Sequence, residues 1–423
     1  MLGKGKERFP MAQGERNFWR SRLFVDKAPK PVPAGPRIWF HAASVGEVNG
    51  SLGIFNRLGA ACPHAALYLS VGTPQGYRFA RSHVPDGVQV FPAPVDVPWA
   101  VCRTVSRLCP DLFVALESEF WPVLHWCLRK HRIPVVLLNG RVSERSVGRY
   151  RRLSFVFGRV FRAIRWASVK TVEDARRLAS LGVPAHRIAV MGSAKYDSLS
   201  DRADPSVIHG WRRRLEIPDG TPVVVGGSLR GAECRTLLEI FKDLKDDHPD
   251  LVGLFAPRHL DRVPQMIQWL ERHHLPYELL SSFLSQTPKG RGSDWVVVDC
   301  IGHLFELYGL GDLIFCGGTL VPVGGHNIVE PVAWGKRVYY GPYTDKVFEE
   351  HRVLSRYGVG VMVPDAETLS HRWRDALAAG PLSASAKGAA RQALDELTGA
   401  ADRQVAGLQR FLDRPRAFAP DLP

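Results

Sequence analysis

Short apolar runs and amphipathic stretches alternate along the first half of the chain. The stretches between the apolar runs repeat their apolar residues at the period of a helix, as in residues 47–60 and 172–182. The second stretch ends in Gly182, which is typical of a helix C-terminus. The predicted strands cover residues 37–43, 66–71, 89–94, 112–116, 134–139 and 188–192. This alternation is typical of a parallel, doubly wound α/β sheet.

The alternation restarts after a polar stretch at residues 198–206, which contains a proline and which we interpret as a linker. The predicted strands beyond it cover residues 221–228, 251–257, 295–299, 312–318 and 337–341. We therefore expect two Rossmann-like α/β domains facing a central cleft, over residues 1–197 and 207–423. Residues 390–412 have a helical period, and the prediction leaves open whether this C-terminal helix crosses back to the first domain.

The composition is that of a globular protein with a large positive charge. A chain of 423 residues is too long for one hydrophobic core, and 45% hydrophobic residues is an ordinary value. The formal net charge of +14 fits an acidic partner, which would be nucleic acid, an anionic membrane surface or an acidic substrate, and it fits also a generally basic proteome. No apolar run reaches the roughly 18 to 20 residues that span a bilayer.

Part of the charge is concentrated at residues 141–166, where arginines alternate with aromatic residues. This mixture suits a lipid headgroup surface or a phosphate-bearing ligand, and it suits equally a helix with one solvated face. The seven cysteines are scattered without a Cys-x-x-Cys pair. That distribution favours a reducing compartment over structural zinc or a disulfide framework.

Candidate chemistry begins at the end of the first predicted strand. Ser44 and Glu47 have the Ser-x-x-Glu spacing of a capping box, in which the glutamate satisfies the start of its own helix. The small residues Ala42, Ala43 and Gly46 leave room for a ligand at the carboxyl edge of the sheet, where Glu47 is placed to act as a general base. The two roles compete for the same oxygens, and the sequence leaves both open.

Other charged residues follow neighbouring predicted strands. Glu117 and Glu119 come directly after one strand, and they form either an exposed acidic pair or part of the cleft. Arg141 and Arg145 follow the next strand, so we expect them to be the ion partners of these glutamates. Lys195 lies just before the linker, which places it near the cleft.

In the second half, glycine-rich turns are candidate phosphate sites. The stretch 224–233 reads as a strand, a glycine turn and a helix start, where backbone N–H groups and the helix dipole favour an anion. The stretch 316–344 gives the strongest signal: a strand, two glycine pairs and then an expected helix that carries His326, Asn327 and Glu330. Glu330, one turn into that helix, is placed to accept hydrogen bonds from ribose hydroxyls. It is neither a GxGxxG fingerprint nor a Walker A loop. The expected nucleotide-binding residues are Ser228, Arg258, His259, Gly317, Gly318, Gly325, His326, Asn327 and Glu330.

In six stretches the chain resembles the 3-deoxy-D-manno-octulosonic acid (Kdo) transferases of lipopolysaccharide synthesis. These stretches read HAASVGEV, ESEFWP, NGRVSERS, GSAKYD, PRH and GGTLVPVGGHNIVEPVAWGKRVYYGPYT. They occur in the family's order, the resemblance runs from about residue 5 to beyond residue 360, and the last stretch is highly specific. The resemblance implies a glycosyltransferase of the type B fold that needs no metal or cofactor. It would move Kdo from CMP-Kdo to the lipid A precursor, with inversion at the anomeric carbon.

The resemblance also implies roles for particular residues. It makes Glu47 the catalytic base, and it makes Arg258, Asn327 and Glu330 contacts of CMP. The other matches near the cleft are Glu117, Glu119 and Lys195. The implied acceptor is phosphorylated and lies in an anionic membrane, which would place the protein peripherally at the cytoplasmic face of the inner membrane. Family members commonly open with an apolar anchor that the first residues here lack, so the mode of attachment stays open.

Other functions stay open beside this one. Within the same fold, the alternatives are another type B glycosyltransferase or a sugar-nucleotide epimerase. A basic protein that binds nucleic acid or a membrane surface is the alternative outside enzymes. The chain contains no helix-turn-helix, zinc-finger or RNA-binding signature, so we expect no nucleic-acid partner.

Overall fold

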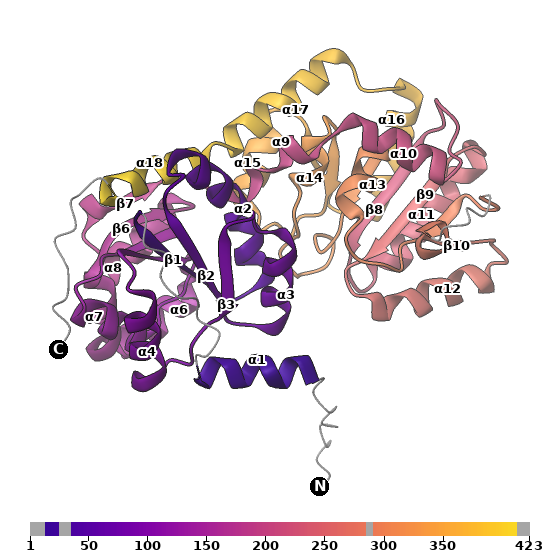
Figure 1. The fold of residues 1–423 in the computed structure, drawn as a ribbon. Coiled ribbons are helices and arrows are strands. Elements are labelled where there is room, and N and C mark those ends of the chain that lie inside the picture. The colour runs from indigo at the N-terminus through magenta and orange to yellow at the C-terminus, as the bar shows by residue number, and fades with distance from the viewer. Residues whose placement is uncertain (1–12, 25–34, 285–290, 413–423) are drawn as a thin grey trace, which may run out of the picture. The chain divides into compact units, whose positions relative to one another are not determined.

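The structure is a computed structural model that describes residues 13–24, 35–284 and 291–412 (Figure 1). The chain divides into two compact units, each with one seven-stranded parallel sheet. Unit 1 comprises Met1–Ser198 and Thr398–Pro423, and unit 2 comprises Leu199–Leu397. The prediction of two doubly wound α/β domains is confirmed.

The sheet of unit 1 has the strand order β3-β2-β1-β4-β5-β6-β7. The order reverses between β1 and β4, so the carboxyl ends of these strands flank the crevice where ligands of such folds collect. The strands are β1 (Arg37–Ala42), β2 (Ala66–Val71), β3 (Val88–Pro92), β4 (Leu112–Leu116), β5 (Val135–Gly140), β6 (Ile164–Val169) and β7 (Ile188–Val190). The helices are α1 (Gln13–Phe24), α2 (Val45–Ala61), α3 (Pro74–His83), α4 (Pro98–Leu108), α5 (Pro122–Lys130), α6 (Glu144–Arg152), α7 (Ser154–Ala163), α8 (Val172–Ser180) and α18 (Ala400–Leu412), with 3-10 turns η1 (Ala185–Arg187) and η2 (Ala194–Tyr196).

Two apolar layers cover this sheet because its strands are apolar on both faces. In β1, Ile38 and Phe40 pack in the layer that contains α2, α3 and α18, whereas Trp39 packs in the layer that contains α4, α5, α7 and α8. All three side chains are fully buried. The polar residues that follow each strand therefore lie at the sheet edge, outside these layers.

The sheet of unit 2 has the order β10-β11-β9-β8-β12-β13-β14, with its reversal between β8 and β12. The strands are β8 (Val223–Leu229), β9 (Val252–Pro257), β10 (Glu278–Leu279), β11 (Trp295–Val297), β12 (Leu313–Cys316), β13 (Val338–Tyr340) and β14 (Gly360–Met362). The α-helices are α9 (Leu199–Arg202), α10 (Pro205–Arg214), α11 (Glu233–Asp247), α12 (Val263–Arg272), α13 (Leu304–Leu310), α14 (Glu330–Ala333), α15 (Phe348–Arg356), α16 (Ala366–Ala379) and α17 (Ala384–Leu397), and the 3-10 turns are η3 (Leu260–Arg262) and η4 (Leu280–Leu284). Helices α11, α12 and α16 cover one face, and α10, α13, α14, α15 and α17 cover the other (Figure 1).

The secondary structure differs from the prediction in a few places. Strand β6 lies at the end of the basic and aromatic stretch 141–166, whose arginines masked its apolar run. The short edge strands β10 and β14 were also not predicted. No helix within the described parts of the chain is both long and apolar enough to cross a membrane.

The unit boundaries differ from the expected domains at two points. The stretch 198–206, expected as a linker, contains α9 and the start of α10, where Asp204 caps the helix through the backbone N–H of Ser206. Helix α18 was placed with the second domain by the range 207–423, yet it packs in unit 1. The C-terminal helix therefore crosses back to the first domain, a possibility that the sequence left open.

Helix α18 joins unit 1 through apolar and polar contacts. Ala400, Ala401, Val405 and Leu408 belong to the apolar layer that contains α2. The fully buried Gln404 donates hydrogen bonds of 3.0 Å to Asn139 Oδ1 and to Ser168 Oγ. A cross-sheet polar network of this kind fixes the helix in one register.

Gly407 tests the docking of α18. A Cβ atom at Gly407 would lie 2.1 Å from Cη2 of Trp166 on β6, so Gly407→Ala forces the helix away from the sheet. We expect the free energy of unfolding to fall by about 1–3 kcal/mol, which chemical denaturation measures. The matched control is Gly388→Ala on α17, where a Cβ would meet nothing within 4 Å, so this variant should gain up to about 1 kcal/mol from helix propensity.

Candidate active site

Glu47 lies in the first turn of α2, directly beyond the end of β1. Ser44 is the N-cap residue, and its Oγ accepts a hydrogen bond of 3.4 Å from the Glu47 backbone N–H. The Glu47 carboxylate in turn accepts from the Ala43 N–H at 2.5 Å and from the Ser44 hydroxyl at 3.2 Å. The capping geometry that the Ser-x-x-Glu spacing indicated is therefore present.

The Glu47 carboxylate can still accept a proton while it caps its helix. A carboxylate has about four acceptor positions, and the two hydrogen bonds to Glu47 leave the others for a proton. Burial, together with the negative charges of Glu119 and Glu117, raises the pKa of Glu47 to about 8, even though the two hydrogen bonds lower it. A carboxyl group with this pKa exchanges its proton near neutral pH, as a general base must.

Glu117 and Glu119 follow β4, at the strand that neighbours β1. Glu117 has a positive φ of 54°, and its carboxylate pairs with Lys170 Nζ at 3.0 Å. Glu119 is 9% exposed and accepts a hydrogen bond of 2.6 Å from Trp121 Nε1. The structure therefore brings Glu47, Glu117 and Glu119 together as a cluster, which we call the carboxylate cluster.

The arginines expected as partners of this cluster are placed differently. Arg141 is exposed, and its contribution to the cluster is a backbone N–H that donates to the Glu117 carbonyl at 3.2 Å. The expectation that Arg141 and Arg145 pair with the glutamates is wrong: Lys170 pairs with Glu117. Lys170 directly follows β6, a strand that was not predicted, so its position could not be derived from the sequence.

Lys195 lies in the 3-10 turn η2, beside α2. The ammonium group of Lys195 lies 5.7 Å from the centre of the Tyr196 ring. The Cβ of Lys195 would lie 3.9 Å from a Cβ added at Gly50, so the two residues are neighbours. Asn139, buried and with a φ of 53°, fixes this turn, because it accepts from the Ala194 N–H at 3.0 Å and donates to the Gly50 carbonyl at 3.2 Å. The Asn139-Gly140 pair at the end of β5 was the sequence signal for Asn139, although no role for Asn139 was predicted.

In unit 2, a buried carboxylate organises the predicted glycine turn. Glu233, 1% exposed at the start of α11, accepts hydrogen bonds from the N–H groups of Arg230, Gly318, Thr319 and Leu320 at 2.6–2.9 Å. The expected anion site at the start of α11 is therefore filled by the protein's own carboxylate. The sequence analysis missed Glu233 because an acidic residue in the first turn of a helix is commonplace.

Glycines let the turn lie against this carboxylate. A Cβ at Gly317 would lie 2.8 Å from Glu233 Oε2 and 2.6 Å from the carbonyl oxygen of Ser228. Gly318 has a φ of 73°, and a Cβ there would lie 2.7 Å from the His326 ring. Both positions exclude other residues, so the expected glycine pair is required for the close approach of β8, β12 and the turn.

Positive charges gather around His326. Its Nε2 accepts a hydrogen bond of 3.3 Å from Arg230 Nε. Burial, together with the charges of Arg258, Arg230, Lys346 and His259, lowers the pKa of His326 to about 4. The ring is therefore neutral at pH 7, and the surrounding groups form what we call the basic cluster: Arg230, Arg258, His259 and Lys346. The sequence analysis named Arg258 and His259 and missed the other two.

Asn327 and Glu330 lie next to each other, but not on the helix that was expected. Helix α14 begins at Glu330, so His326 and Asn327 precede it in irregular structure. Gly324 and Gly325, with φ of 91° and 88°, turn the chain before them in conformations that a helix does not allow. Asn327 Nδ2 donates to Glu330 Oε1 at 2.9 Å and Oδ1 accepts from Val329, so the amide side chain orients the carboxylate.

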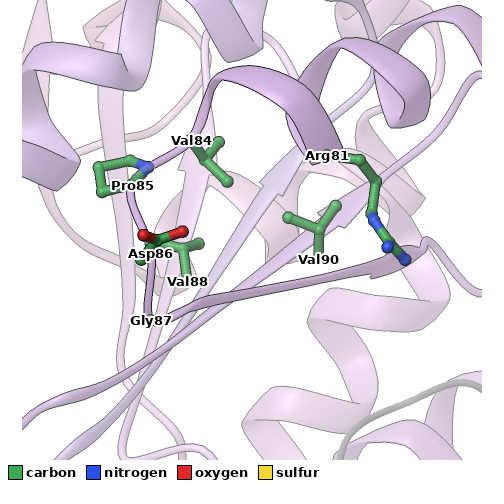
Figure 2. Close-up of a pocket in the computed structure, with 7 residues that line it drawn as sticks. All are labelled: Arg81, Val84, Pro85, Asp86, Gly87, Val88 and Val90. Atoms are coloured by element: carbon green, nitrogen blue, oxygen red, sulfur yellow. The ribbon is translucent and has the colours of Figure 1, made fainter.

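A hollow of about 220 Å³ lies between the end of α3 and the start of β3, at the amino edge of the unit 1 sheet and so away from the carboxylate cluster (Figure 2). None of the predicted site residues lines it. Within the described residues, no group of three or more His, Cys, Asp and Glu side chains is placed to hold a metal ion. The expectations of no metal and no cofactor stay predictions.

Comparison with known proteins points to one family. The family model described as 3-deoxy-D-manno-octulosonic-acid transferase matches residues 16–198. A 3-deoxy-D-manno-octulosonic acid transferase of Chlamydia pneumoniae is 30% identical over 81% of this chain and 78% of its own. A bifunctional glycosyltransferase/methyltransferase of Fusobacterium nucleatum is 31% identical over 78% of this chain, which spans 51% of that longer protein.

Solved structures resemble the chain in fold. A UDP-GlcNAc 2-epimerase from Neisseria meningitidis has a TM-score of 0.63 and 12% identity, over 88% of this chain and 100% of its own. A glycosyltransferase from Rickettsia africae has a TM-score of 0.61 and 13% identity, over 90% of this chain and 100% of its own. These likenesses place the chain in the type B fold of glycosyltransferases and epimerases.

The raised pKa of Glu47 has a consequence for stability. The pKa lies near 8 in the folded chain and near 4.5 in the unfolded chain, so the folded state binds more protons between these values. Stability from this group is therefore complete below about pH 4.5 and is lost as the pH rises through 8. Glu47→Gln keeps an acceptor for Ala43 but has no charge to bury. Its free energy of unfolding relative to the original chain should rise by roughly 1–3 kcal/mol between about pH 5 and about pH 9, as measured by denaturant titration.

Glu233→Ala tests the support of the glycine turn. The change leaves the N–H groups of Gly318, Thr319 and Leu320 without their acceptor, so their amide hydrogen exchange should accelerate tenfold or more, with a stability loss of about 1–3 kcal/mol. Glu239→Ala on the exposed side of the same helix should leave both quantities unchanged. Unaltered exchange at the turn in the Glu233 variant would contradict the assignment.

Proposed function

The chain belongs to the family of 3-deoxy-D-manno-octulosonic acid transferases, which are glycosyltransferases, and we propose that it moves Kdo from CMP-Kdo to the lipid A precursor. The observation that carries the proposal is the carboxyl group of Glu47. It combines a pKa of about 8 with a position at the carboxyl edge of the unit 1 sheet, among the carboxylate cluster. An acid buried beside two like charges is costly for a fold, and such sites are typical of catalysis.

In the proposed reaction Glu47 is the catalytic base. A hydroxyl group of the acceptor attacks the anomeric carbon of Kdo, and its proton passes to the Glu47 carboxylate. The new C–O bond forms as the C–O bond to the phosphate of CMP breaks, and the electron pair of that bond leaves with CMP. Attack on the face opposite the phosphate inverts the anomeric carbon. A base with a pKa of about 8 then returns its proton to solvent readily.

We assign the basic cluster of unit 2 to the CMP phosphate. Arg230, Arg258 and Lys346 bring positive charges toward a neutral His326, and the turn held by Glu233 lies between them and β12. Such fixed charges stabilise the phosphate as it gains negative charge in the transition state. They supply the charge compensation for which other transferases use a metal ion, so the proposal includes no metal and no cofactor.

The remaining predicted contacts fit a nucleoside. The Glu330 carboxylate, oriented by Asn327, is placed to accept hydrogen bonds from the vicinal hydroxyls of the ribose. Ser228, at the end of β8 with a φ of 54°, lies on the same edge of the sheet, next to the glycine turn. Gly317, Gly318 and Gly325 shape the turn beside these contacts, and His259 follows Arg258 directly after β9.

A membrane-bound, phosphorylated acceptor accounts for the exposed surface of α6 and α7. Leu153, which joins the two helices, and Phe155, in the first turn of α7, are 40% and 74% exposed. They follow Arg149, Arg151 and Arg152 in the last turn of α6. Exposed apolar side chains flanked by arginines bind anionic lipid headgroups. We therefore propose peripheral binding at the cytoplasmic face of the inner membrane, with Arg141 and Lys195 near the acceptor.

Glu47→Gln tests the function and the base together. Purified protein incubated with CMP-Kdo and lipid A precursor should give a product heavier by whole Kdo residues in mass spectrometry. The variant should lose activity by about 100-fold or more while CMP still protects it against thermal unfolding. Glu173→Gln is the matched control, because Glu173 is also a first-turn acid of a unit 1 helix but is exposed.

The outcomes separate the alternatives. Near-normal turnover by the Glu47 variant would overturn its role as base. Protection by UDP instead of CMP would favour another type B glycosyltransferase or an epimerase, whose fold the chain shares. No transfer by the original chain, with CMP protection retained, would overturn the proposed acceptor.

A further inference from the structure

His41 is a buried polar residue that the proposed mechanism leaves without a role. It lies on β1 and is 2% exposed, with its ring stacked near Phe113 and edge-on to Trp121. Its Nδ1 is 2.8 Å from Ser70 Oγ, which also accepts a hydrogen bond of 2.8 Å from Trp39 Nε1. These contacts hold the imidazole in one orientation.

The other ring nitrogen faces the carboxylate cluster. His41 Nε2 lies 3.5 Å from Glu119 Oε2 and has no hydrogen-bond partner in the structure. The same oxygen accepts from Trp121 Nε1 at 2.6 Å. A buried nitrogen without a partner is costly unless it carries a proton toward an acceptor, and the nearest acceptor is a carboxylate.

We propose that His41 is a positioning residue that keeps Glu119 negatively charged beside Glu47 and thereby sets the pH range in which Glu47 acts as a base. The proposal deepens the proposed function and rests on it. His41 touches no reacting atom. It acts through Glu119, and Trp39 and Ser70 act through His41.

The electrostatics of the cluster agree with this arrangement. Burial alone would raise the pKa of Glu119, yet its pKa lies below the ordinary value because His41 and Trp121 outweigh burial. The charge of Glu119 is in turn the largest contribution after burial to the raised pKa of Glu47. The contact with His41 thus stabilises the charge on one carboxylate, and that charge strengthens the other carboxylate as a base.

Other titratable groups face the same residues. Asp96, whose carboxylate accepts from the N–H groups at the start of α5, and the fully buried His125 both respond to the charge of His41. The pKa of Tyr150 is raised by burial and by Glu119, and Lys170 compensates Glu117. None of these groups lies between His41 and Glu119, so the pair is the direct contact.

The test is the pH dependence of kcat/KM for Kdo transfer. In the original chain it should rise with an apparent pKa of about 8. Glu119→Gln removes the neighbouring charge, so the rise should move to lower pH, and the activity at about pH 6.5 relative to about pH 9 should increase threefold or more. His41→Asn keeps the contact to Ser70 but lacks the distal nitrogen, and it should shift the profile in the same direction. His41→Gln places an amide donor at Glu119 and should stay close to the original profile.

The double variant makes the test specific. If His41 acts through Glu119, the profile of His41→Asn combined with Glu119→Gln should coincide with that of Glu119→Gln. A further shift, or an equal loss of activity at every pH in the single His41 variant, would overturn the proposal. Ser70→Ala removes the hydroxyl group that orients the His41 ring, so it should give a smaller shift of the pH profile. His64→Asn at an exposed position should leave the profile unchanged.

A second measurement does not depend on transfer. The infrared band of the protonated Glu47 carboxyl, identified as the band missing in Glu47→Gln, should disappear near pH 8 in the original chain and at lower pH in Glu119→Gln and His41→Asn. This shift without any Kdo transfer would overturn the proposed function and keep the electrostatic coupling. Transfer with an unshifted band would overturn the inference about His41 alone.

Discussion

Repulsion between carboxylates dominates the edge of the unit 1 sheet. Glu47, Glu117 and Glu119 share a partly desolvated volume, in which like charges interact much more strongly than in water. The fold compensates two of them, with Lys170 on Glu117 and with His41 and Trp121 on Glu119. Glu47 has only neutral hydrogen-bond donors among the described residues. The proton therefore stays on Glu47, the acid of this cluster that contacts no cation. The positions of Lys170 and His41 thus decide which of the three glutamates is the base.

The second unit uses a glutamate in the opposite way. Glu233 is more deeply buried than Glu47, but four backbone N–H groups surround its oxygens. Its carboxylate holds the glycine turn, and the charges of the basic cluster act instead on His326. The two sites thus follow one rule: a carboxylate with enough donors is a scaffold, and a carboxylate with too few donors is available for chemistry.

Much of this arrangement could be predicted from the sequence. The apolar strands and the residues that follow them place Glu47, Glu117, Glu119 and Arg258 at sheet edges, because parallel strands all end at the same edge. Long-range pairings could not be predicted. Lys170 reaches Glu117 from a strand hidden among arginines, and the helix expected at His326 is prevented by two glycines with positive φ. In the sequence, His41 looks like any other residue of a buried strand. Its partners Ser70 and Glu119 belong to or follow two other strands, so the sequence does not show that they contact it.

The crossing of α18 into unit 1 bears on how the protein is made. Asn139 and Ser168 receive their hydrogen bonds from Gln404, 265 and 236 positions later in the chain, and Trp166 packs against Gly407. During synthesis, the whole of unit 2 leaves the ribosome before these partners do. Unit 2 has all its strands in one continuous segment and can fold as it emerges. The part of the unit 1 sheet face that α18 covers therefore stays exposed until α18 has been synthesised, which makes unit 1 the part that most needs a chaperone.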